Sequence, residues 1–173
     1  MLEIRSENEL QGLERQILKS CVQPIELLRS GQFTEIELFR HIKFEKIGLH
    51  PIENRSINFI EQVNQTFTYL ACIKAVRQLY ALHPNVSGFV CDPGASAKTR
   101  LDILSIENGL IGAEVFASVI PSNNNKLSKD QAKLSNSQEQ FRYSFFISPK
   151  YPFTERHKKM EKHLGVEVWS LEY

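Results

Sequence analysis

Two acidic residues in neighbouring apolar segments are the residues of this chain best suited to chemistry. Asp102 lies within Leu101-Asp-Ile-Leu-Ser-Ile, and Glu114 lies within Ile111-Gly-Ala-Glu-Val-Phe-Ala-Ser-Val. A carboxylate in such a half-buried segment loses hydration and needs a partner, and a divalent cation is one such partner. Two carboxylates holding Mg²⁺ or Mn²⁺ would suit metal-assisted cleavage of a phosphodiester bond.

The residues between these carboxylates predict a β-hairpin. Glu107-Asn108-Gly109 has the composition of a tight turn, and strand-like apolar segments lie on both sides of it. A hairpin here would place Asp102 and Glu114 side by side at one edge of a sheet. Period-two alternation would then put Glu114 and Phe116 on the same face.

The wider pattern predicts an α/β protein with a central mixed sheet flanked by helices. We expect a mostly helical extension over residues 1–55, packed on an α/β core over residues 56–173. The longest helix should be capped by Ser56 and stopped by Pro84. The expected helices are 10–22, 24–29, 34–42 (with Thr34 and Glu37 as a capping box), 57–82, one within 123–134 and 153–164; the expected strands are 88–91, 99–106, 110–120, 141–148 and 166–171.

Composition narrows the class of protein. The chain has 173 residues, is 42% hydrophobic and carries a net charge of +1, so any nucleic-acid site must be a local basic patch. The three cysteines, Cys21, Cys72 and Cys91, have no metal-binding spacing, and we expect them to be reduced core residues. With no secretory or membrane-spanning pattern, we expect a cytoplasmic protein that does not interact with membranes.

The element order from Ser56 onward resembles the core of the PD-(D/E)XK nuclease superfamily, also called the restriction endonuclease-like fold. Over residues 56–173, Asp102 matches the first acid of the family motif, Glu114 the second, and Glu61 an acid on the first helix. The resemblance implies that Asp102 and Glu114 bind Mg²⁺ or Mn²⁺ and that Glu61 is an auxiliary ligand or base. It implies a nucleic-acid substrate, and we expect DNA rather than RNA.

One position departs from the family pattern. The family places a Lys two residues after the second acid, and this position is Phe116 here. In one interpretation the cation comes from the next helix, where Lys126, Lys129 and Lys133 recur at helical spacing. We favour Lys126 as the catalytic cation because it lies nearest the strand end. In the other interpretation catalysis is lost, and the fold serves as a scaffold that binds nucleic acid or a protein.

Structural explanations stay open for each candidate residue. Asp102 could hydrogen-bond the backbone of a turn, and Glu114 could form an ion pair with Lys98 or Arg100. Glu61 could be a solvated helix residue.

Three further segments carry weaker indications. Asp92-Pro-Gly-Ala-Ser-Ala has the small residues of a phosphate-binding turn. The apolar residues of the extension would pack on the core or form a homodimer interface. A basic cluster near the C-terminus would be either a phosphate-binding patch or a solvated surface; it contains Lys150, Tyr151, Arg156, Lys158, Lys159 and Lys162.

Overall fold

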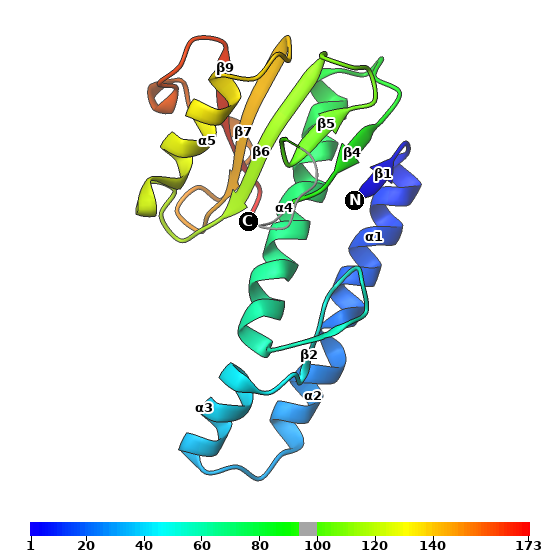
Figure 1. Cartoon of the computed structure of the whole chain (residues 1–173), viewed down its shortest axis with the longest axis vertical. Coiled ribbons are helices and arrows are strands. Elements are labelled where there is room, and N and C mark those ends of the chain that lie inside the picture. Colours follow the sequence, from blue (N-terminus) through cyan, green and yellow to red (C-terminus); the bar gives the residue numbers. More distant parts are fainter. Residues whose placement is uncertain (94–99) are drawn as a thin grey trace. The chain divides into compact units, whose positions relative to one another are not determined.

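The structure is a computed structural model that describes residues 1–93 and 100–173 (Figure 1). The chain divides into two compact units, one formed by residues 1–7 and 71–173 and the other by residues 8–70. The boundary falls within the longest helix, α4 (Phe59–Leu82), so each unit contains part of this helix. Within the described ranges, no helix is long and apolar enough to span a membrane.

The first unit is built on a seven-stranded mixed sheet with the order β1-β4-β5-β6-β7-β9-β8. The strands β6, β7 and β9 are parallel to one another, and the remaining pairs are antiparallel. The expected α/β class with a mixed sheet is therefore confirmed. The strands are β1 (Leu2–Ile4), β4 (Phe89–Cys91), β5 (Ile103–Ser105), β6 (Ile111–Ala117), β7 (Phe141–Ile147), β8 (Glu155–Arg156) and β9 (Val166–Leu171).

Helices cover both faces of this sheet. Helix α5 (Lys126–Ser135), preceded by the short turn η1 (Asn123–Asn125), contacts β6, β7 and β9, and in Figure 1 α4 passes behind the sheet. On the α5 side, Leu127 packs with Phe116 of β6 and Phe146 of β7. Each such buried apolar side chain contributes roughly 1.5–3 kcal/mol to folding. The packing fixes α5 over the face of β6 that carries Glu114.

The second unit, residues 8–70, is mainly helical. It contains most of α1 (Glu7–Ser20), α2 (Val22–Ser30), α3 (Glu35–Phe44), the hairpin of β2 (Gly48–Leu49) with β3 (Ser56–Ile57), and the start of α4. The buried Gln62 holds it together, because its amide donates to the Ser20 carbonyl at 2.9 Å and accepts from the Leu49 N–H at 2.9 Å. The expected capping box is present, with Glu37 accepting the Thr34 N–H at 2.9 Å.

The structure corrects three predicted elements. The predicted helix 153–164 is instead β8 followed by the short turn η2 (Lys158–Met160), because the backbone of 155–156 pairs with β9. The predicted strand at 99–106 is limited to β5, and Thr99 lies outside the described residues. Ser56 lies in a strand rather than capping α4; the Asn58 side chain caps the helix by accepting the Glu61 N–H at 2.8 Å.

Two smaller predictions concern the chain start and the cysteines. Residues 2–4, expected in the helical extension, form the strand β1, which pairs with β4 and buries Ile4. All three cysteines are free thiols. Cys72 and Cys91 are buried as expected, whereas Cys21 is half-buried.

Two glycine substitutions compare a tightly packed position in β6 with an open position in α1. A Cβ on Gly112 would lie 2.4 Å from the Leu101 side chain and 2.8 Å from that of Glu139, so Gly112→Ala should destabilise the protein by about 1–3 kcal/mol. In contrast, a Cβ on Gly12 in α1 meets nothing within 4 Å, and Gly12→Ala should stabilise by about 0.5–1 kcal/mol through helix propensity. Urea unfolding of both variants measures the difference; equal effects would contradict the packing described.

Candidate functional site

The structure brings Asp102 and Glu114 together on one face of the sheet. The register of β5 and β6 pairs Ile103 with Ala113, and one further step along the hairpin places Asp102 opposite Glu114. Each carboxylate accepts a hydrogen bond from the backbone of the facing segment: Glu114 Oε1 accepts the Asp102 N–H at 3.2 Å, and Asp102 Oδ2 accepts the Val115 N–H at 3.0 Å. These bonds fix the orientation of both side chains.

Both carboxylates are more deeply buried than the half-buried positions we expected. Glu114 is 2% exposed and Asp102 is 9% exposed. Burial raises the pKa of Glu114 to about 7, and the negative charge of Asp102 adds to the increase; the hydrogen bond and charge of Lys133 oppose it. Glu114 is therefore a carboxyl group that exchanges a proton near neutral pH.

The ammonium group that contacts Glu114 belongs to Lys133. Lys133 Nζ lies 2.7 Å from Glu114 Oε1, and its side chain is 47% exposed. The favoured Lys126 instead pairs with Asp130, one helical turn later, at 2.6 Å. Lys126 was favoured by closeness along the chain, but the direction in which α5 crosses β6 brings its later turn over Glu114.

Asp130 is a member of the cluster that the sequence did not suggest. Its carboxylate is buried, and desolvation raises its pKa despite the opposing hydrogen bond and charge of Lys126. Desolvation would lower the pKa of Lys126, but the Asp130 hydrogen bond and the charges of Asp130, Asp102 and Glu114 outweigh it and raise that pKa. A usable indication in the sequence was the position of Asp130 on the same helix stripe as the apolar Leu127 and Leu134.

Phe116, two residues after Glu114, has a packing role. It is 7% exposed, and its ring stacks on Phe146 with centroids 6.0 Å apart. Lys126 Nζ lies 5.9 Å from the centroid of the Phe116 ring, within range of a cation–π contact. The aromatic side chain thus supports the N-terminal turn of α5 and leaves the charged contact with Glu114 to Lys133.

Glu61 lies in the first turn of α4, within the helical unit 8–70, and Arg55 Nη2 lies 3.7 Å from its carboxylate. Arg100, one alternative partner of Glu114, bonds Glu139 instead. Lys98, the other alternative partner, and the end of the proposed phosphate-binding turn at 94–97 lie outside the described residues.

The site offers oxygen ligands of the kind that a hard divalent cation prefers, but few of them. Asp102 and Glu114 provide carboxylate oxygens, the ligands that Mg²⁺ prefers, and Mg²⁺ often binds through one or two carboxylates with water and substrate phosphate completing its shell. Across residues 1–93 and 100–173, no group of three or more His, Cys, Asp or Glu side chains is placed to hold a metal ion. A cation held at Asp102 and Glu114 would therefore depend on water or a bound phosphate for the rest of its ligands.

Comparisons with known proteins give no family assignment. No family model matches the chain, and searches of curated proteins and of solved structures each found no match.

The raised pKa of Glu114 predicts a specific pH dependence of stability. Because the folded pKa of about 7 exceeds the ordinary 4.5, the folded state binds more protons between these values, and stability is lost as the pH rises through that window. Relative to Glu114→Gln, which cannot ionise, the wild-type free energy of unfolding should fall by about 3 kcal/mol between about pH 4.5 and about pH 8.

Urea unfolding across this range measures that difference. The control is Glu172→Gln, which makes the same substitution at an exposed carboxylate. A constant difference between wild type and Glu114→Gln would show that folding does not raise the pKa of Glu114, and it would contradict this prediction.

Proposed function

We propose that this chain is a nuclease-like protein, related in architecture to the PD-(D/E)XK superfamily, that hydrolyses phosphodiester bonds of nucleic acid with the help of Mg²⁺ or Mn²⁺. The observation that carries this proposal is the pairing of Asp102 with Glu114 across the β5–β6 hairpin, with Lys133 in contact with Glu114. The mixed sheet, with helices on both faces, supports the proposed restriction endonuclease-like core.

The carboxylates of Asp102 and Glu114 would hold the divalent cation. A bound cation would supply Lewis acidity toward water and would neutralise charge on a phosphate. Cation binding and protonation compete at Glu114, because its pKa is near 7 and a metal ligand must be deprotonated. The proposed activity should therefore increase as the pH rises through 7.

Lys133 takes the role that the family assigns to the Lys at the position of Phe116. Its side chain is half-exposed, so its ammonium group can contact both Glu114 and a phosphate oxygen arriving from solvent. A fixed ammonium group at this point would stabilise the negative charge that develops on the phosphate in the transition state. Lys126, the lysine favoured from the sequence, is paired with Asp130, so the proposal gives this role to Lys133.

The alternative is a non-catalytic scaffold on the same fold that binds nucleic acid or a protein partner. It is favoured by one observation: Glu114 is almost completely buried and already has a cationic partner, as in a structural ion pair. The two proposals differ in whether changing the carboxylates removes an activity.

Plasmid nicking in Mg²⁺ or Mn²⁺ separates these proposals. The wild-type protein should nick supercoiled DNA, and the Asp102→Asn, Glu114→Gln double variant should retain only background activity. Lys133→Met should lower the rate by about 10²–10³-fold because one charged stabiliser of the transition state is lost.

The matched control is Lys129→Met, which removes an exposed lysine from the same helix and should leave nicking unchanged. Equal nicking by wild type and the double variant would exclude the catalytic proposal. Equal loss in Lys129→Met and Lys133→Met would exclude the role given to Lys133.

A further inference from the structure

We propose that a basic pocket on the opposite flank of α5 from Glu114 binds a phosphate group of a nucleic-acid backbone. This inference rests on the proposed function and deepens it by assigning a substrate-binding subsite. The pocket has a volume of about 350 Å³ and lies between the 120–125 loop, the N-terminal turn of α5, the turn at 150–151 and the segment 159–162.

The charge of the pocket wall favours an anion. Lys150, Lys159 and Lys162 all line the pocket, and no carboxylate lines it among the described residues. Other members of the predicted basic cluster are placed differently. Arg156 is neutralised by Glu161 and Glu167, each at 2.7 Å. Within the basic cluster, Arg156 is therefore ion-paired, whereas Lys150, Lys159 and Lys162 line the pocket.

Buried hydrogen bonds hold the lysine-bearing segment in place. Gln131 of α5 is fully buried; its amide donates to the Met160 carbonyl at 3.1 Å and accepts the Lys162 N–H at 2.7 Å. Lys162 Nζ donates to Ser128 Oγ at 3.0 Å. Since Gln131 anchors the backbone on both sides of residue 161, Lys159 and Lys162 are fixed along the pocket wall.

The rest of the lining suits a nucleotide rather than a bare ion. Leu127 is buried, and Tyr151 and Met160 are half-buried, so they give the pocket an apolar side next to the lysines. A sugar or base can pack on such a surface while its phosphate contacts ammonium groups. Hydroxyl and amide groups of Ser122, Asn125 and Ser128 add neutral hydrogen-bonding partners.

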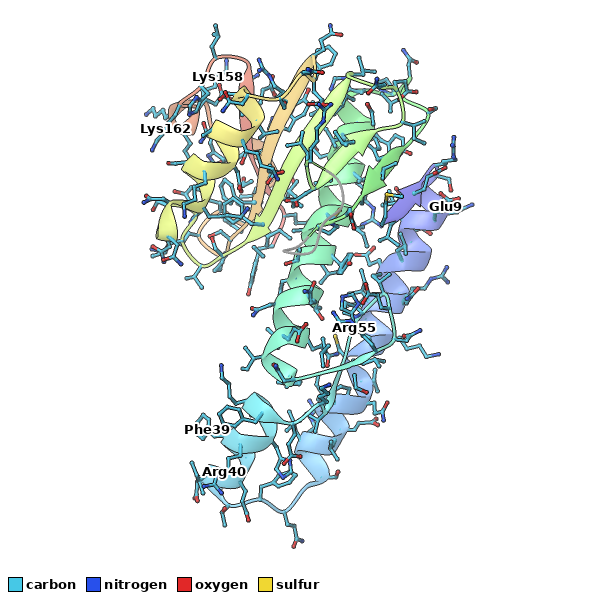
Figure 2. All side chains as sticks on the ribbon, in the orientation of Figure 1. Glu9, Phe39, Arg40, Arg55, Lys158 and Lys162 are labelled. Carbon is cyan, nitrogen blue, oxygen red and sulfur yellow. The ribbon has the colours of Figure 1, made fainter. Side chains whose placement is uncertain are left out.

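The pocket and the carboxylate site lie on two flanks of one helix. Lys126, Asp130 and Lys133 recur at helical spacing on the Glu114 side, whereas Ser128 is turned by roughly 200° around the axis from Lys126. Figure 2 shows Lys158 and Lys162 on the same margin of the sheet unit, beside α5. A strand crossing α5 from one flank to the other could therefore contact the pocket with one phosphate and the carboxylate site with another.

The test is salt-dependent binding of fluorescent single-stranded and double-stranded DNA and RNA oligonucleotides, with EDTA present to prevent cleavage. The Lys150→Gln, Lys159→Gln, Lys162→Gln triple variant should bind at least tenfold more weakly than wild type at low salt. Its slope of log affinity against log salt should be shallower by about 2–3, because a protein that has lost three phosphate contacts releases fewer counterions on binding. Thermal unfolding would confirm that the triple variant is folded.

The matched control removes the same total charge from exposed lysines outside the pocket and outside the basic cluster, through Lys19→Gln, Lys43→Gln and Lys46→Gln. This control should keep the wild-type slope. Equal slopes for the two triple variants, or no nucleic-acid binding by wild type, would overturn the assignment. A mononucleotide or inorganic pyrophosphate that binds more tightly than the oligonucleotides would also overturn it, because the pocket would then serve a small phosphate compound.

The two proposals fail in different ways. The Asp102→Asn, Glu114→Gln variant should keep wild-type nucleic-acid binding in EDTA, because it leaves the pocket intact. Loss of nicking with retained, pocket-dependent binding would support both proposals, whereas absence of nicking in wild type with pocket-dependent binding would contradict only catalysis.

Discussion

The burial of Glu114 beside Asp102 is the interaction on which the rest of the sheet unit depends. Two carboxylates at one place in a low-dielectric environment repel each other and lose hydration, which is why the pKa of Glu114 is raised to about 7. Backbone N–H groups of the β5–β6 hairpin and the ammonium group of Lys133 compensate for part of this loss. The burial of these two carboxylates lowers the stability of the fold, and such costly groups with a shifted pKa are typical of functional sites.

Helix α5 links this carboxylate pair to the other features of the unit. Its buried stripe packs on Phe116, Phe146 and Val168, and the polar residues on its two sides have different surroundings. One side places Lys126, Asp130 and Lys133 near the carboxylates, and the other contributes Ser128 to the basic pocket. The Phe116 ring packs against α5, the helix that carries Lys133 to its contact with Glu114.

Features that depend on residues close together in the sequence could be predicted from the sequence. The hairpin followed from Asn108-Gly109, and Gly109 does adopt a left-handed φ of +73° at the turn. Alternation along β6 then determined that Glu114 and Phe116 share a face. The capping box at Thr34 and Glu37 was also readable, because both partners lie within one helical turn.

Features that depend on packing between distant segments could not be read in this way. The contact of Lys133 with Glu114, and of Lys126 with Asp130, depends on how α5 packs on the sheet through Leu127 and Leu134. The segment 153–164 has a charged, helix-like pattern, yet its backbone pairs with β9 and its His157 ring stacks on Phe146. Tertiary pairing outweighed local propensity there.

Diffraction from crystals soaked in Mn²⁺, with the anomalous signal used to locate the ion, is the most direct test of the central claim. We predict an anomalous peak bonded to carboxylate oxygens of both Asp102 and Glu114, with Lys133 still beside the pair. No peak at saturating Mn²⁺, with Glu114 retaining its contact with Lys133, would show that these residues form a structural ion pair and would contradict the account.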